Sequence, residues 1–184
     1  RGTCVLFGDG AGAAYLEESD KGIISVVQGS IGKKGMVLNC ESRRTHNIFT
    51  EDGIEHDYLH MDGQEVYKFA VRQCPKCLLE ALEKADMTAD DIDYFVLHQA
   101  NVRIIESVAK RLKAPIEKFP MTLGYTGNMS AASVPVMLDS LVRDGGLKRG
   151  DKVAMSAFGA GSTQRYIRLQ KTQPKYRRSE RFAS

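Results

Sequence analysis

The sequence has no long apolar run. No stretch of its 184 residues approaches the roughly 18 consecutive apolar residues that a membrane-spanning helix needs, so no membrane span is predicted. The opening residues, RGTCVLFGDG, also lack the form of a secretory signal peptide. They lead almost directly into an apolar run, and from this we expect that a preceding segment is missing. A hydrophobic content of 42% with 27% charged residues is typical of a globular domain with a core of its own.

Excess positive charge is scarce outside the C-terminal end. The chain carries a net charge of +3, but residues 171–184 contribute +4 from five cations and one anion, so the remainder has a net charge of −1. The main part therefore shows no overall signature of nucleic-acid binding, and no nucleic-acid partner is expected. The end, KTQPKYRRSERFAS, has little to bury, so we predict a disordered basic tail over 171–184. It is either simply solvated or in contact with an acidic partner.

Cysteines are few: the sequence has four. Cys74-Pro-Lys-Cys77 has the spacing of a redox or zinc motif, but no second cysteine pair accompanies it. His56 and His60 would suit a metal pair only on a helix with a third ligand, so no metal site is expected. One apolar stripe at helical spacing instead predicts that both cysteines are structural and buried. It comprises Val66, Ala70, Cys74, Cys77, Ala81 and Ala85.

The order of elements predicts an α/β fold with a mixed five-stranded sheet. Strands are predicted over 3–7, 14–18, 94–97, 151–158 and 162–169, with a further candidate at 22–27. Helices are predicted over 64–85, with a kink or restart at Pro75, over 101–112, and before Gly145. GDGAGAA (8–14) lacks the Lys-Ser/Thr ending of a phosphate-binding loop and so predicts a tight turn between two strands.

The helix before Gly145 is apolar around most of its circumference. Its apolar residues do not fit on one stripe: Val134, Val136, Met137, Leu138, Leu141 and Val142. Such a helix is normally buried on several sides, which a single sheet does not provide. We therefore expect the chain to be half of a larger layered body.

Two polar residues stand at ends of predicted elements. His98 follows the apolar strand YFVL, and Asn128 lies in a glycine-rich loop before the apolar helix. His98 is either a core histidine with a satisfied hydrogen bond or a catalytic group, because ligands of α/β sheets gather outside the C-terminal strand ends. A neutral imidazole and a carboxamide both donate hydrogen bonds. Aimed at one oxygen, the two would form an oxyanion hole.

The motifs LHQAN, GNMSAAS and AFGAGST, in this order, resemble the C-terminal half of β-ketoacyl-acyl-carrier-protein synthase III, of the thiolase-like superfamily. FGDGAGAA and MDGQEVYKFAV fit the same family, and the resemblance runs over about residues 3–163. It implies that residues 1–170 form the C-terminal thiolase-like domain, normally one half of a layered α-β-α-β-α body.

The activity implied by the resemblance is a decarboxylative Claisen condensation that starts fatty-acid synthesis in the cytoplasm. An acyl-CoA primer is joined to malonyl-acyl-carrier protein. No cofactor is permanently bound, because coenzyme A and phosphopantetheine only carry the substrates. The acyl-carrier protein, a missing N-terminal half and a second copy in a homodimer are the implied partners.

The resemblance also assigns residues. It implies that His98 and Asn128 stabilise the enolate oxygen of the malonyl thioester, that the backbone N–H of Ala160 binds the acyl-cysteine oxyanion, and that Phe158 shapes the site. The implied lining of the pantetheine channel is Gly63, Tyr67, Ala100 and Asn101. The implied carrier-protein contact is Gln99, Ala100, Asn101, Val102 and Arg103, with a basic patch of Arg103, Lys110 and Arg111. For these three cations a merely solvated helix face is the alternative.

The sequence also departs from the family pattern. The nucleophilic cysteine of the family belongs to the N-terminal half, and none of the four cysteines here has its context. Ala160 replaces a glycine, and Gln164 and Arg165 stand where an aromatic residue and a glycine are usual. The chain alone is therefore not expected to perform the condensation. Two alternatives remain: a non-catalytic module that binds carrier protein or pairs with a partner half, and an acyl-CoA condensing enzyme of secondary metabolism.

Overall fold

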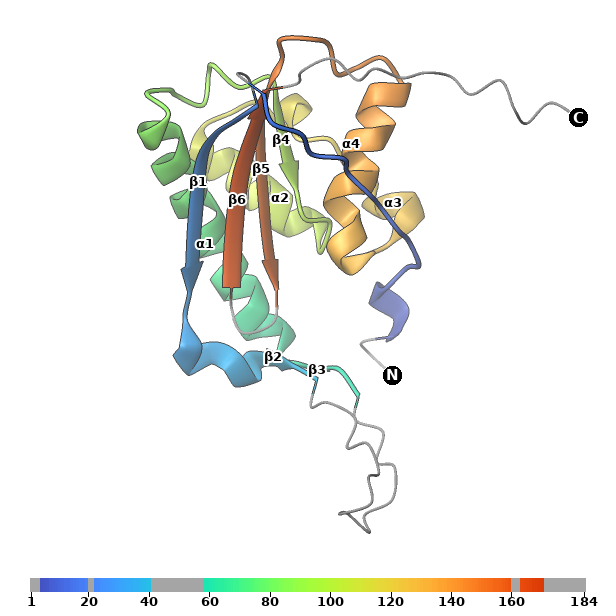
Figure 1. Ribbon diagram of the computed structural model, residues 1–184. Helices are drawn as coiled ribbons and strands as arrows, with labels where there is room; N and C mark the ends of the chain where they lie inside the picture. The colour runs from blue at the N-terminus through green and yellow to red at the C-terminus, as the bar shows by residue number, and fades with distance from the viewer. Residues whose placement is uncertain (1–3, 20–21, 41–57, 160–162, 171–184) are drawn as a thin grey trace, which may run out of the picture.

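The computed structural model describes residues 4–19, 22–40, 58–159 and 163–170. Its centre is a four-stranded sheet in the order β1-β6-β5-β4 (Figure 1). The strands are β1 (Ile23–Ser30), β4 (Tyr94–Leu97), β5 (Lys152–Gly159) and β6 (Thr163–Gln170). β4 is parallel to β5, whereas β6 is antiparallel to both of its neighbours. The sheet is therefore mixed, as predicted.

Helices cover both faces of the sheet. Helices α1 (Gly63–Lys84) and α2 (Val102–Leu112) pack on one face, and α4 (Ser133–Arg143) lies on the other (Figure 1). Successive side chains of a strand point to opposite faces. Accordingly, Phe95 and Leu97 join the core under α1 and α2, while Val96 packs toward α4. This three-layer arrangement confirms the predicted α/β class.

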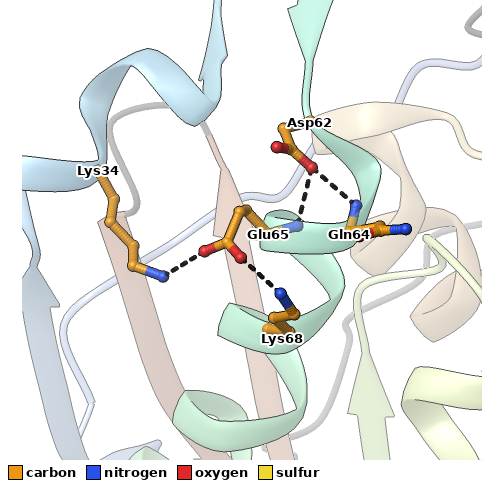
Figure 2. Close-up of polar contacts among 5 residues, drawn as sticks. All are labelled: Lys34, Asp62, Gln64, Glu65 and Lys68. Atoms are coloured by element: carbon orange, nitrogen blue, oxygen red, sulfur yellow. Dashed lines mark hydrogen bonds and ion pairs between the residues drawn. The ribbon is translucent and has the colours of Figure 1, made fainter.

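Helix α1 begins at a well-defined cap. The Asp62 carboxylate accepts hydrogen bonds from the backbone N–H groups of Gln64 and Glu65, each at 3.0 Å (Figure 2). These bonds satisfy donors that the first helical turn leaves without partners. Pro75 lies inside the helix, which nevertheless runs unbroken, so a restart at this residue does not occur.

An ion-pair cluster ties the first turn of α1 to a neighbouring 3-10 helix, η2 (Gly32–Val37). The Glu65 carboxylate accepts from Lys68 at 2.8 Å and from Lys34 at 2.9 Å (Figure 2). The hydrogen bonds from Lys68 and Lys34 lower the pKa of Glu65 to about 2. The hairpin that follows η2 is thus anchored beside the start of α1; it pairs β2 (Leu38–Asn39) with β3 (His60–Met61).

The smaller elements lie on the α4 side or in connections. They are η1 (Cys4–Leu6), η3 (Ile116–Lys118), α3 (Leu123–Thr126) and η4 (Ser130–Ala132). None of the helices in the ranges given above is long and apolar enough to cross a membrane. The tail over 171–184 and His56 lie outside the described residues, so the domain boundary after residue 170 stays a prediction.

The two strands predicted over 3–7 and 14–18 are wrong. Residues Cys4–Leu6 form a 3-10 helix, and 8–19 have no regular secondary structure, so the sheet has four described strands instead of five. A strand needs a neighbour for its backbone groups. Phe7 finds one in a single bridge to Asn128, whereas Tyr15 and Leu16 are 86% and 73% exposed.

The glycines of GDGAGAA serve close packing instead of a hairpin turn. A Cβ atom at Gly8 would lie 1.9 Å from the carbonyl oxygen of Thr126, and one at Gly12 would lie 2.6 Å from the ring of Pro135. The extended segment after η1 therefore passes close to the end of α3 and to the start of α4, and Figure 1 shows it running past both helices. A side chain at either position would force the segments apart.

Burial of the α1 cysteines is confirmed. Cys74 and Cys77 are 3% and 7% exposed, lie in the core under α1, and form no disulfide. Burial raises the pKa of the Cys74 thiol to about 12. In the part of the chain that the structure describes, no group of three His, Cys, Asp or Glu side chains is placed to hold a metal ion.

Helix α4 is only partly covered. Met137 is buried against the sheet, but Val134, Leu138 and Leu141 are half-buried and Val142 is 39% exposed. The described residues do not supply the remaining cover that we expected for this helix, and that cover stays a prediction.

Candidate active site

A cavity of about 570 Å³ opens at the C-terminal ends of the parallel strands β4 and β5. Several separate parts of the chain contribute most of its wall. These are the end of β4 with His98, Ala100 and Asn101; the end of β5 over 156–159; the loop over 128–131; the start of α1; and the β2–β3 hairpin. η1 closes one side with Leu6 and Phe7. The cavity sits where α/β sheets generally bind ligands.

His98 is held in this wall by its backbone. Its N–H donates to the carbonyl oxygen of Ser156 at 2.8 Å, and its carbonyl oxygen accepts from the N–H of Ala100 at 3.1 Å. The imidazole ring lies edge-on to Phe158, with 5.3 Å between ring centroids. No side-chain hydrogen bond reaches the ring from the described residues, which disfavours the interpretation as a satisfied core histidine.

Burial also fixes the charge of His98. Desolvation in this apolar wall lowers the pKa of its imidazole to about 4. At neutral pH the ring is therefore uncharged, with one nitrogen carrying a proton and the other a lone pair. A neutral ring of this kind donates a hydrogen bond without needing a counter-ion.

Asn128 reaches the cavity from the loop between α3 and η4. Its backbone N–H donates to Leu6 and its carbonyl oxygen accepts from Gly8, both at 3.0 Å. Its side-chain Oδ1 accepts from the N–H of Ser130 at 2.8 Å. This bond orients the carboxamide so that Nδ2 keeps its protons for another acceptor. Gly127, at φ +65°, makes the bend that brings the residue here.

The arrangement places two uncharged donors on one largely apolar cavity. An imidazole N–H and a carboxamide N–H stabilise negative charge that develops on an oxygen, and the effect is strong where water is excluded. Neither side chain is placed as a strong base, because the pKa of His98 is low and a carboxamide does not titrate. The site therefore suits a reaction that builds an oxyanion without needing a protein base.

The structure also gathers the predicted channel residues. Gly63, Tyr67, Ala100 and Asn101 all line the same cavity, although α1 and the end of β4 are far apart in the sequence. Phe158 lines it too, and packs edge-on to Phe69 at 6.4 Å. Asn101 has a second task, since its Oδ1 caps α2 by accepting from the N–H of Arg103 at 2.9 Å. Ala160 lies outside the described residues.

The predicted carrier-protein contact divides into two groups. Val102, Arg103, Lys110 and Arg111 are exposed on α2. Arg111 is also held to the neighbouring helix, because its Nη1 donates to the carbonyl oxygen of Val71 at 3.1 Å. Gln99 is different: its side chain is completely buried and hydrogen-bonded inside the protein. Gln99 is thus removed from the predicted contact surface, because a buried amide does not reach a partner.

Sequence patterns missed part of the cavity. Leu38 and Met61 reach it from the β2–β3 hairpin, and Ser156 from β5. The only sequence signal near the hairpin is Asp62 before Gly63, which marks a helix start. Leu38 stands in an irregular stretch with no periodicity, so nothing local predicted its place.

The chain is similar in sequence to one family of known proteins. Residues 82–169 match the family described as 3-oxoacyl-[acyl-carrier-protein (ACP)] synthase III C terminal, and residues 1–35 match 3-oxoacyl-[acyl-carrier-protein (ACP)] synthase III. The β-ketoacyl-[acyl-carrier-protein] synthase III of Clostridium novyi (strain NT) is 47% identical over 165 residues, which cover 89% of this chain and 51% of that protein. The chain spans about half the length of the curated relatives it matches.

Solved structures agree in fold. The β-ketoacyl-[acyl carrier protein] synthase III of Thermus thermophilus aligns with a TM-score of 0.78 and 36% identity, over 95% of this chain and 54% of that one. The priming β-ketosynthase from the R1128 polyketide biosynthetic pathway aligns with a TM-score of 0.74 and 37% identity, over 83% of this chain and 46% of that one.

Proposed function

Because the chain belongs to the 3-oxoacyl-[acyl-carrier-protein] synthase III family and corresponds to its C-terminal part, we propose that it supplies the oxyanion site of a condensing acyltransferase. The reaction is the decarboxylative Claisen condensation of an acyl-CoA primer with malonyl-acyl-carrier protein. The observation that supports it is the pair of uncharged donors, His98 and Asn128, on one cavity at the ends of β4 and β5.

The chemistry follows from these donors. In the malonyl thioester the bond between the α-carbon and the carboxylate breaks, carbon dioxide leaves, and the electron pair passes into an enolate. Its oxygen takes the negative charge and accepts hydrogen bonds from His98 and Asn128. Each such donor lowers the barrier by roughly 3 kcal/mol. Loss of carbon dioxide itself generates the carbanion, so no protein base is needed, consistent with the low pKa of His98.

The nucleophile is proposed to come from elsewhere. The carbanion would attack an acyl group held on a cysteine of an N-terminal half, and none of this chain's cysteines lines the cavity among the described residues. We propose that this half and a second copy complete the enzyme. Ala160, through its backbone N–H, is the proposed donor for the second oxyanion.

The substrate arm is proposed to enter past α1 and the end of β4. Gly63, Tyr67, Ala100 and Asn101 line this part of the cavity, which suits a narrow pantetheine arm of coenzyme A or acyl-carrier protein. The carrier protein itself would contact Val102 and Arg103, with Lys110 and Arg111 further along α2. Exposed cations on one helix favour an acidic partner. Action in the cytoplasm remains a prediction.

Removing either donor tests the proposal. In the protein assembled with the half that carries the acyl-accepting cysteine, His98→Ala and Asn128→Ala should each reduce carbon dioxide release from malonyl-acyl-carrier protein by about 10² or more. Acylation of the cysteine by acyl-CoA should be unaffected. His60→Ala, an exposed histidine outside the cavity lining, is the matched control. Normal decarboxylation in both donor variants would show that the assignment is wrong.

The chain alone gives a second test. Without the partner half, incubation with acetyl-CoA should leave no single cysteine stoichiometrically acylated, as measured by intact mass. Full acylation of one of the four cysteines would overturn the division of the site between two halves.

A second candidate keeps the chemistry and changes the pathway. It is supported by the 37% identity to the priming β-ketosynthase of a polyketide pathway, which is close to the 36% identity to the Thermus thermophilus synthase III. A panel of acyl-CoA primers distinguishes the two, because an enzyme of fatty-acid initiation should prefer short primers used in that process. The non-catalytic alternative predicts carrier-protein binding that persists with no turnover in the assembled protein.

A further inference from the structure

Gln99 is a buried polar residue between the two segments that carry the donors. Its side chain is fully enclosed, at 0% exposure. Its Nε2 donates to the carbonyl oxygen of Leu97 at 2.9 Å and to that of Pro120 at 3.4 Å. Its Oε1 accepts from the backbone N–H of Thr122 at 3.1 Å. Both ends of the amide are therefore in use.

The chemistry of these partners allows only one orientation of the amide. Leu97 and Pro120 offer carbonyl oxygens, which are acceptors, while Thr122 offers an N–H, which is a donor. Because the side chain is excluded from water, a lost bond is not replaced by solvent. The amide thus joins the end of β4 to residues 120–122 in one fixed geometry.

Residues 120–122 lead directly to the second donor. The carbonyl oxygen of Thr122 accepts from the N–H groups of Tyr125 and Thr126, each at 3.0 Å, and from the hydroxyl of Thr126 at 3.0 Å. This short helix, α3, is followed by its C-cap Gly127, immediately before Asn128. On the other side, Gln99 follows His98 directly. Gln99 therefore connects the two donors by a short hydrogen-bonded path.

We propose that Gln99 is a positioning residue that sets the separation of His98 and Asn128, an inference that rests on the proposed function of those two donors. The role differs from stabilising the fold in general, because it acts on the geometry of one site. A displacement of about 1 Å between groups that stabilise a transition state can cost about 10² in rate. Gln99 thus fixes how the side chains of His98 and Asn128 lie relative to each other.

The first experiment uses the full chain and no substrate. Gln99→Asn keeps the amide but shortens it by one methylene, and Gln99→Glu keeps the length but loses the donor when ionised. NMR of the Asn128 side-chain amide and the His98 ring should show shifted signals in both variants. Gln64→Asn, an exposed glutamine on α1 outside the cavity lining, should leave them unchanged. Unmoved Asn128 signals in folded Gln99 variants would overturn the proposal.

The second experiment separates positioning from stability. In the assembled protein, Gln99→Asn should lower kcat for malonyl decarboxylation by about 10- to 100-fold, with KM changed by less than about 2-fold. In an Asn128→Ala background the same substitution should cost less than about 2-fold, because its effect passes through Asn128. Equal losses in both backgrounds would show that Gln99 does not act through that donor.

The two experiments also distinguish failures. If His98→Ala and Asn128→Ala leave decarboxylation intact, the proposed function is wrong, and Gln99 no longer has a reaction to position. If those variants are inactive while Gln99→Asn and Gln99→Glu are folded and fully active, only the positioning role is wrong. Should Gln99→Glu fail to fold at neutral pH, Gln99→Asn, which keeps the donor, decides the question.

Discussion

The two faces of the sheet differ in how completely they are covered. On the face of α1 and α2, large side chains such as Leu78 and Ile105 have no exposure, and Phe95 stacks on Phe119 with 4.7 Å between ring centroids. On the face of α4, the buried cluster is small and Val142 remains 39% exposed. The difference indicates that most of the buried apolar packing lies on the face of α1 and α2. Both faces contribute to the cavity, through Val66 and Tyr67 of α1 and Val134 of α4.

Thiol labelling should show the largest contrast. Cys74 and Cys77 lie in the closed core, whereas Cys4 and Cys40 are exposed. Because the buried thiols need an opening of the structure to react, their labelling by a disulfide reagent should be slower by at least about 10³-fold. Rates are followed by mass spectrometry, and labelling in urea serves as the control. Rapid modification of Cys74 in the folded chain would contradict a sealed α1 face.

Matched leucines test the energetic asymmetry. Leu78→Ala, in the closed core, should lower the free energy of unfolding by about 2–5 kcal/mol, because it removes buried contacts and leaves a cavity. Leu138→Ala, on half-buried α4, should cost about 1 kcal/mol. Leu79→Ala, which is 50% exposed and adjacent to Leu78, is the control. Urea unfolding measures the free energy of unfolding of all three variants. Equal losses for Leu78→Ala and Leu138→Ala would contradict the difference between the two faces.

The pH dependence of stability gives a smaller effect. The pKa of His98 falls from its ordinary 6.5 to about 4 on folding, so the unfolded chain binds more protons between these values. The contribution of His98 to stability is fully present above pH 6.5, is lost as the pH falls to 4, and changes no further below pH 4. The loss is up to about 3 kcal/mol, at about 1.4 kcal/mol per pKa unit.

Glu65 affects stability in a second, lower pH range. Its pKa is lowered from 4.5 to about 2, so its contribution is present above pH 4.5 and is lost as the pH falls through 2. Urea unfolding from pH 8 to 3 should therefore show the His98 loss first. His98→Gln should remove the decrease between pH 6.5 and 4. A decrease in that window that persists in this variant would mean that another group causes it.

Local patterns predicted much of the sheet and helices. Tyr94–Leu97 is a strand with the predicted bounds, and the periodic stripe of α1 places Cys74 and Cys77 in the core. The strands predicted over 3–7 and 14–18 failed because strand formation depends on a neighbouring edge, which local sequence does not report. For the same reason, nothing in the local sequence predicts that β1 pairs with β6, because the two strands are about 140 residues apart.

The candidate site was predicted in part. The motifs around His98 and Asn128 identified two donors, and the structure brings both to one cavity. The family resemblance implied that Gln99 contacts the carrier protein, yet Gln99 is buried. Its burial follows from carbonyl oxygens and an N–H at Leu97, Pro120 and Thr122, whose convergence no periodicity predicts.

The sequence by itself determined which residue types stand at the ends of the elements and which helix faces are apolar, because both depend on spacing along the chain. Only the tertiary structure decided how those groups behave. His98 is uncharged at neutral pH because distant segments remove water from around its ring. Gln99 joins two loops because their backbone groups meet at its amide. Solvent exclusion and the fit of backbone partners are properties of contacts between remote segments, and these exist only once the chain has folded.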